Sequence, residues 1–344
     1  MRNVPLSELF QVKGRFRRSV HLERDFYTEN ALNGYVLTAT AREMLSRVIS
    51  TLENEATSKA WTLTGPYGSG KSAFALFTAK LLGDPNASTT QQALDLLKQG
   101  DTTLYDRFVY TNGNGKSSLS GFCPVLISGE RAPLSLGLLR GLVQGLTASN
   151  STISSTSLIQ KSQKLLETAE KGTLPSASEI TSLFESATHE ICGSGGSGLL
   201  VVIDELGKFL EYATQQPTQG DMFVLQTLAE FADRSENTPL FLMTILHQAF
   251  ERYAERAGKS QQEEWAKVQG RFEDIAFSES TEQVLRLVGT ALEKHSAIVH
   301  KDNLNISIDL GLKPHQLPNT PNTCLLYTSP SPRDRTRSRM PSSA

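Results

Sequence analysis

The chain has 344 residues, of which 38% are hydrophobic and 20% charged, and its formal net charge at pH 7 is −2. A chain of this length can bury one large α/β core, or a core with a small appended domain, and its mildly acidic balance gives no global reason to expect nucleic acid as a ligand. It has no long apolar run and no signal-peptide core, and its few cysteines lack metal-ligand spacing, so we expect a cytoplasmic protein with no membrane partner.

Residues 1–34 are polar and irregular, and we interpret them as an N-terminal arm. Arginines alternate there with apolar side chains, as they do in segments that contact nucleic acid. We favour the other interpretation, in which the apolar side chains pack on the core and the arginines stay in solvent. The residues concerned are Arg15, Phe16, Arg17, Arg18, Val20, Arg24 and Phe26.

The next segment predicts a short strand over 35–37, followed by a helix. Thr40 with Glu43 three residues later has the spacing of a capping box, which would begin that helix. A strand, turn and helix placed before a phosphate-binding loop is where many ATPases hold adenine. Tyr35 and Val36 are therefore candidates for contact with a base.

Such a loop follows at once, because residues 65–72 read GPYGSGKS and satisfy GxxxxGKS. An apolar run over 61–63 predicts the buried strand that leads in, and helical apolar spacing leads out to Leu82. The glycines allow backbone conformations that a Cβ would forbid, so that successive N–H groups can point at phosphate oxygens. The helix that begins near Gly70 adds the positive end of its dipole.

We therefore expect a nucleoside triphosphate, with ATP and Mg²⁺ as the first choice. Lys71 would place its ammonium between the β- and γ-phosphates, and the Ser72 hydroxyl would be a ligand of Mg²⁺. A chance match in a glycine-rich turn is the alternative. The predicted nucleotide-binding residues are Gly65, Pro66, Tyr67, Gly68, Ser69, Gly70, Lys71, Ser72 and Ala73.

Residues 83–120 are interpreted as an insertion, with a helix over 90–98 and then an irregular stretch. The sequence GNGKSS at 113–118 imitates a phosphate loop, but Tyr110 occupies the place of the first glycine, so we interpret it as a polar loop. Downstream, apolar patterns and a Ser/Thr-rich connector predict a buried strand and three helices. These are a strand over 122–131 and helices over 134–146, 158–170 and 177–190.

A second motif is the apolar run over 199–203, which is followed directly by Asp204 and Glu205. A fully apolar run is typical of a central parallel strand with both faces covered by helices, and ligands bind at the carboxyl ends of such strands. Asp204 would hold Mg²⁺, directly or through water and Ser72, and Glu205 would polarise the attacking water. An ordinary strand end is the alternative.

A helix over 222–232 and a further strand over 239–248 come next. A polar residue at the tip of the strand beside the catalytic one often senses the γ-phosphate, and His247 fits that place, with Gln248 as its neighbour. A histidine satisfied by backbone at a strand end is an equally good interpretation.

The pattern of residues 263–294 predicts a helix end, an exposed Gly-Arg pair, a short strand over 274–277 and a last helix. Together with GPYGSGKS and VVIDE, this order resembles the AAA+ and STAND branch of P-loop ATPases over about residues 35–294. The resemblance implies that Arg271 is an arginine finger, which would reach the ATP of a neighbouring subunit in a homo-oligomer. A surface arginine is the alternative, and Arg286 is a second candidate for a lid sensor.

The phrasing of the loop and the helical elaborations also resemble the motor regions of large bacterial phage-defence ATPases. These resemblances imply an α/β fold, namely a three-layer αβα core with a mostly parallel sheet over 35–280, followed by the start of a helical lid over 281–323. The first function they imply is an ATP hydrolase that moves DNA or remodels a defence complex. The second is an ATP-dependent oligomerisation switch that signals to a missing effector, and a small-molecule kinase comes third.

The end of the chain has another origin. The segments CLLYTSPSPRD, from Cys324 to Asp334, and SRMPSSA, from Ser338 to Ala344, back-translate to DNA that resembles the adapters of sequencing libraries. We therefore expect residues 324–344 to be a non-native tail and the natural reading frame to be truncated at or before Thr323.

Overall fold

The structure is a computed structural model of the chain. It describes residues 10–13, 16, 18–53, 58–113, 121–148, 156–216, 222–235, 238–255 and 257–294. The chain divides into one unit from Met1 to Glu293 and another from Lys294 to Ala344, and apart from Lys294 the described residues all belong to the first. The expected adapter-derived tail, the rest of the expected lid and most of the GNGKSS stretch lie outside the described residues.

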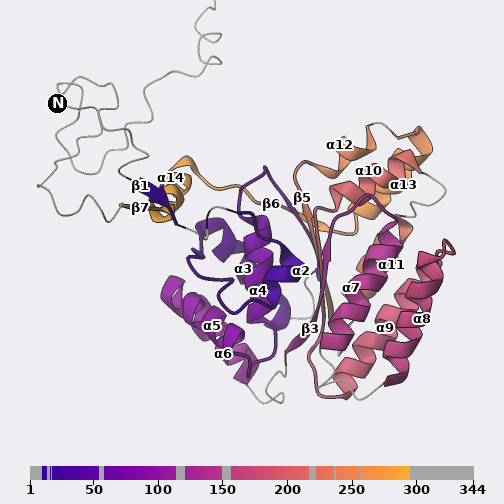
Figure 1. Ribbon diagram of the computed structural model, residues 1–344, viewed down its shortest axis with the longest axis horizontal. Coiled ribbons are helices and arrows are strands. Elements are labelled where there is room, and N and C mark those ends of the chain that lie inside the picture. Colours follow the sequence, from indigo (N-terminus) through magenta and orange to yellow (C-terminus); the bar gives the residue numbers. More distant parts are fainter. Residues whose placement is uncertain are drawn as a thin grey trace, which may run out of the picture. The chain divides into compact units, whose positions relative to one another are not determined.

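A five-stranded sheet, in which every strand pairs in parallel, forms the centre of the first unit (Figure 1). Its order is β3-β4-β5-β2-β6. The strands are β2 (Ala60–Thr64), β3 (Phe122–Ser128), β4 (Gly198–Asp204), β5 (Leu240–Leu246) and β6 (Glu273–Ala276). Every residue of β4 and β5 is buried, as expected of central strands with helices on both faces.

Helices cover both faces of the sheet, and two apolar clusters fill the layers between (Figure 1). Side chains of β4 alternate between them: Leu199 and Val201 belong to one cluster, Leu200 and Val202 to the other. This confirms the predicted α/β architecture with a parallel sheet between helical layers. One layer contains α2 (Leu22–Phe26), α3 (Ala39–Glu53), α4 (Lys71–Leu81), α5 (Ser88–Gly100) and α6 (Thr102–Gly113). The other contains α7 (Leu134–Ala148), α8 (Thr156–Glu170), α9 (Ala177–Gly193), α10 (Gly207–Gln215), α11 (Phe223–Arg234), α12 (Phe250–Ala254) and α13 (Lys259–Gln269).

The last described elements are α14 (Thr281–Ala291) and β7 (Leu292–Lys294), which pairs with β1 (Phe10–Val12). The Lys13 backbone N–H donates to the Ala291 carbonyl at 2.9 Å, so the residue after β1 is tied to the end of α14. No residue of α14 is buried. None of the helices within the described ranges is both long and apolar enough to cross a membrane.

Two local predictions are wrong. Residues 35–37 form no strand, because Tyr35 closes a turn to the Leu32 carbonyl and its ring stacks on Phe77 of α4 at 4.9 Å between centroids. The cap of α3 is Thr38, whose Oγ1 accepts from the Ala41 N–H at 3.2 Å, so Thr40 does not begin the helix.

The stretch after 98 is a third error, because α5 continues to Gly100 and α6 follows where no helix was predicted. Leu104 and Phe108, one helical turn apart, are 7% and 3% exposed and belong to the cluster beneath α3 and α5. That spacing was the available signal.

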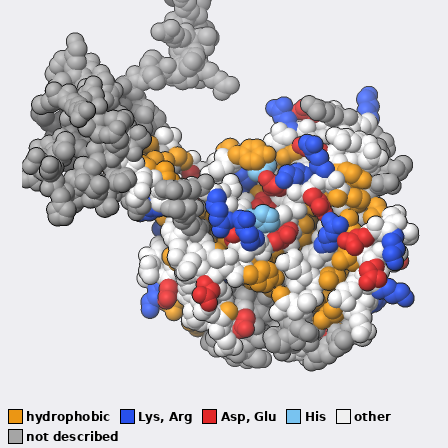
Figure 2. Space-filling model, in the orientation of Figure 1, with side chains coloured by type: hydrophobic (Ala, Val, Ile, Leu, Met, Phe, Trp, Pro, Cys, Tyr) orange, Lys and Arg blue, Asp and Glu red, His pale blue; other side chains and the backbone are white. Residues whose placement is uncertain are grey.

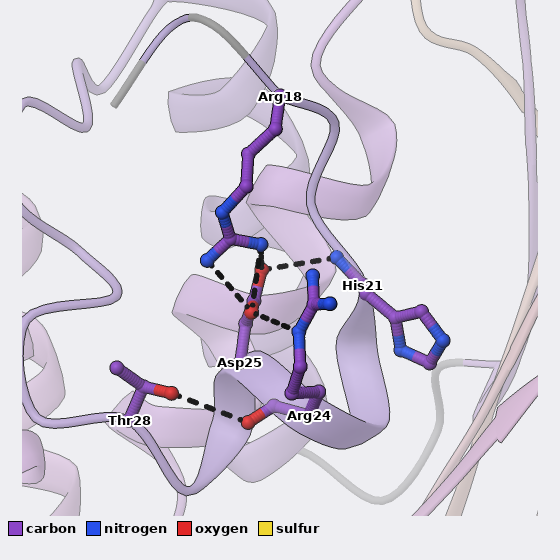
Figure 3. A network of polar contacts seen from close by, with 5 residues as sticks. All are labelled: Arg18, His21, Arg24, Asp25 and Thr28. Carbon is purple, nitrogen blue, oxygen red and sulfur yellow. Dashed lines mark hydrogen bonds and ion pairs between the residues drawn. The ribbon is translucent and has the colours of Figure 1, made fainter. Parts of the chain in front are cut away.

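The described part of the arm packs on the core through α2, whose Leu22 is fully buried. Figure 3 shows the contacts that fix it: the Asp25 carboxylate accepts from the Arg18 guanidinium, from Arg24 Nε at 3.2 Å and from the His21 backbone N–H at 3.0 Å. Burial acts to raise the pKa of Asp25, but these hydrogen bonds outweigh it and hold the pKa below its ordinary value. Two of the arm's arginines, Arg18 and Arg24, thus donate hydrogen bonds to a buried carboxylate. Arg15 and Arg17 lie outside the described residues.

Candidate functional site

The glycine-rich loop joins β2 to α4 at the carboxyl end of the sheet. Gly68 and Gly70 have φ of 77° and 94°, which places both in the left-handed region that glycine adopts at no steric cost. Gly65 is needed for a different reason, because a Cβ there would lie 2.2 Å from the Phe277 carbonyl oxygen. The loop conformation therefore depends on its glycines, as the sequence motif requires.

Lys71, the first residue of α4, is only 4% exposed and turns its ammonium back onto the loop. Its Nζ donates to the carbonyls of Gly65 at 2.6 Å and Pro66 at 2.7 Å, and to the Ser69 hydroxyl at 3.1 Å. Burial lowers the pKa of Lys71, and the nearby Asp204 carboxylate opposes that shift. The structure thus brings the buried Lys71 ammonium within electrostatic range of Asp204, a predicted metal ligand.

Asp204 ends β4 and is 6% exposed. Its carboxylate accepts a hydrogen bond from the Glu205 backbone N–H at 2.8 Å, and the Ser72 hydroxyl lies near enough to act on its pKa. Burial raises the pKa of Asp204, and the Glu205 N–H and the Ser72 hydroxyl act against that shift. Ser72 and Asp204, the two predicted metal ligands, therefore lie close together although they are far apart in the sequence.

Glu205 follows Asp204 and has a φ of 51°. Among the residues that the structure describes, it is the only non-glycine residue with a positive φ. Such a conformation is sparsely populated and persists only where neighbouring contacts enforce it. Gly129, just after β3, is one source of those contacts. Its N–H donates to the Asp204 carbonyl at 2.8 Å, and a Cβ on it would lie 2.1 Å from the Glu205 carbonyl oxygen.

Gly129 is a residue that the sequence interpretation missed. The available signal was a glycine immediately after a buried strand, at the edge where parallel strands bind ligands.

Replacing Gly129 by alanine should therefore slow any reaction that uses Glu205. The new Cβ has to push the Glu205 peptide away, and a shift of about 1 Å at a catalytic group can cost about 100-fold in rate. Binding of a ligand in the glycine-rich loop should stay within about twofold, because the Lys71 contacts are not touched. Steady-state kinetics with a binding titration would measure both, and equal loss of binding and turnover would contradict this role.

The matched control for that experiment is Gly193→Ala. A Cβ at Gly193 would meet no atom within 4 Å, and the residue ends α9 without a positive φ.

His247 lies just beyond β5, which runs between β2 and β4, so it occupies the predicted place beside the acidic strand end. Its ring stacks on Tyr67 of the loop at 3.5 Å between centroids, and its Nε2 lies 3.8 Å from Glu205 Oε1. Both ring nitrogens are buried without a hydrogen-bond partner. The interpretation in which backbone groups satisfy the histidine is therefore wrong, and two ring nitrogens without a hydrogen bond, one of them facing Glu205, favour a role with a ligand.

Burial and a nearby cation favour the neutral form of that ring. Burial lowers the pKa of His247, and the Lys71 ammonium lowers it further, while Glu205 acts in the opposite direction. Gln248, its neighbour, is exposed.

The structure does not bring Arg271 to this site. The register pairs Glu273 with Trp61, so Arg271 precedes β6 at the amino end of the sheet, away from the loop. Its Nε lies 3.1 Å from Glu230 of α11. Arg286, the alternative, is exposed and pairs with Glu282 within α14.

Tyr35 and Val36 are half-buried and lie just before α3. The start of α3 contacts the segment after β6, which passes the glycine-rich loop. Thr40 Oγ1 donates to the Ser278 carbonyl at 3.1 Å, and the neighbouring Phe277 carbonyl faces Gly65. The Tyr35 ring, however, is already stacked on Phe77. Val36 is thus a freer candidate for base contact than the tyrosine ring.

The contacts alone define what this site can do. No family model matches the chain, and no curated protein matches it either.

A glycine-rich loop of backbone N–H groups with a buried lysine suits an anionic ligand such as a phosphate chain. Figure 2 shows basic, acidic and histidine side chains gathered close together on the displayed face, with no broad patch of one sign.

The side-chain oxygens of Ser72 and Asp204 also fit a magnesium ion. Among the described residues, no group of three or more His, Cys, Asp and Glu could hold a metal. Mg²⁺ does not need one, because it is commonly bound by one or two protein oxygens together with substrate phosphates and water. The adjoining Ser72 hydroxyl and Asp204 carboxylate are a donor set of that kind.

Proposed function

We propose that the protein binds ATP with Mg²⁺ and hydrolyses it to ADP and phosphate. The observation that carries the proposal is the placement of Ser72, in the first turn after the loop, beside the Asp204 carboxylate at the end of β4. A glycine-rich turn that matched the motif by chance would not be expected to place its serine beside a buried carboxylate at the carboxyl edge of a parallel sheet.

Each residue then has a distinct role. Backbone N–H groups of the loop and the Lys71 ammonium bind the phosphates, and Ser72 and Asp204 hold Mg²⁺. The ion, when bound, neutralises charge that develops on the phosphate oxygens. Glu205 orients the attacking water and accepts its proton, and the neutral imidazole of His247, which has one N–H to donate, supplies a hydrogen bond at the γ-phosphate end.

We further propose that this ATPase is an AAA+ or STAND-type motor that works on DNA or on a defence complex. The all-parallel sheet, with β5 between the loop strand and the acidic strand, supports an ATPase core of that general kind. The partner rests on the sequence resemblance alone.

A nucleotide-dependent assembly switch is the second candidate. The position of Arg271 favours it, because that residue pairs with Glu230 at the end of the sheet away from its own loop. An arginine that completes the site of a neighbouring subunit would make turnover depend on assembly.

Steady-state ATP hydrolysis, measured with and without duplex DNA and at several protein concentrations, distinguishes these functions. The motor predicts turnover per chain that rises with DNA. The switch predicts low turnover together with ATP-dependent assembly seen by light scattering, and Arg271→Ala should then reduce turnover in the assembled state. Absence of ATP binding would overturn both.

A further inference from the structure

Lys208 is a charged residue that the proposed mechanism leaves without a role. It lies in the first turn of α10, three residues after Glu205, and its ammonium contacts Glu205 Oε2. The other carboxylate oxygen, Oε1, faces His247 at 3.8 Å. Both oxygens of the proposed general base therefore face a partner within the protein.

The start of α10 fixes Lys208 relative to that carboxylate. The Leu206 N–H donates to the Ile245 carbonyl of β5 at 3.1 Å, and the next residue, Gly207, packs so closely that a Cβ would lie 2.4 Å from the Tyr253 hydroxyl. Phe209 is buried in the core. Glu211, the next acidic side chain of α10, is paired with Arg131.

The contact occupies one of the two carboxylate oxygens of Glu205. The Lys71 ammonium, which would bind the phosphates, interacts electrostatically with Asp204, whereas the Glu205 carboxylate is in contact with Lys208. A base must direct a free oxygen at the water that it activates, within hydrogen-bond reach. Glu205 has to leave Lys208 before Oε2 can do so.

We propose that Lys208 is a positioning residue that holds Glu205 in an unproductive arrangement and so limits basal ATP hydrolysis. The inference rests on the proposed ATPase function. It assigns no contact with ATP to Lys208, so nucleotide affinity is expected to be independent of this residue. The side chains are 47% and 35% exposed, and a pair of that exposure is modest in strength and weakened by salt.

The test is the turnover of Lys208→Met at saturating ATP. We expect kcat to rise about two- to fivefold with KM for ATP unchanged, which is the range that a half-exposed ion pair allows. Lys208→Arg should keep the low parental rate, because its guanidinium can still bind the carboxylate. Raising the salt concentration should increase kcat of the unaltered protein and leave Lys208→Met unchanged.

Two further variants keep the result unambiguous. The double variant Lys208→Met with Glu205→Gln should be as slow as Glu205→Gln alone, since the gain acts through that carboxylate. Lys171→Met, which removes an exposed lysine after α8, is the matched control and should leave kcat unchanged.

An unchanged or reduced kcat in Lys208→Met overturns the inference and leaves the ATPase assignment intact, provided that the unaltered protein shows turnover that Glu205→Gln abolishes. Without such turnover, both the proposed function and the role of Lys208 are wrong.

Discussion

Lys71→Ala should weaken ATP binding about 100-fold or more. The substitution removes a cation that would donate to the phosphates, and charge-assisted hydrogen bonds of this kind contribute about 1.5–3 kcal/mol each. The loss should appear as a higher dissociation constant in calorimetric titration with ATP and Mg²⁺. Turnover at ordinary ATP concentrations should be lost as a consequence.

The ammonium also donates to the carbonyls of the loop, so a structural effect has to be separated from a direct one. Lys71→Met keeps much of the buried aliphatic chain and should show the same loss of binding with little change in thermal stability. Lys171→Ala, at an exposed position, should bind ATP normally. Parental affinity in both Lys71 variants would show that phosphate binds elsewhere.

Glu205→Gln should retain ATP binding and reduce kcat about 100- to 10,000-fold. The amide is nearly isosteric with the carboxylate but cannot accept the proton of the attacking water, and general base catalysis commonly contributes a factor of that size. Since the backbone at Glu205 is held by Gly129 and Asp204, the positive φ should persist in the variant. Phosphate release at saturating ATP measures the effect.

Glu211→Gln is the matched control for this variant. Glu211 lies on α10 and pairs with Arg131 at the surface, so its loss should leave kcat within about twofold of the parental rate. A parental rate in Glu205→Gln would assign the general base to another group.

The central strands and the loop were predictable from the sequence for physical reasons. Strands β4 and β5 are covered on both faces and therefore consist almost entirely of apolar residues, and the motif between β2 and α4 uses residue types that few other backbones need. Both predictions rest on local pattern. The capping residue of α3 was predicted incorrectly, since Thr38 and Thr40 are equally good caps by type and contacts elsewhere in the chain decided between them.

The contacts of the candidate site were less accessible. The roles of Gly129 and Lys208 depend on which strand ends and helix turns meet Glu205, and no pattern within either segment reports that. The stack of Tyr67 on His247 joins two segments far apart in the chain. For Arg271, prediction is limited in a different way. The resemblance implied a role for this residue, but its position relative to a neighbouring subunit is a property of an assembly rather than of one chain.

The most direct test of the account is the release of phosphate from ATP by the unaltered protein, measured in Mg²⁺ and again after the ion is removed with EDTA. The account predicts steady release in Mg²⁺ that stops in EDTA, because Ser72 and Asp204 then have no ion to hold on the phosphates. Phosphate release that continues at the same rate in EDTA, or no release from protein that binds ATP and Mg²⁺ with every partner supplied, would contradict it.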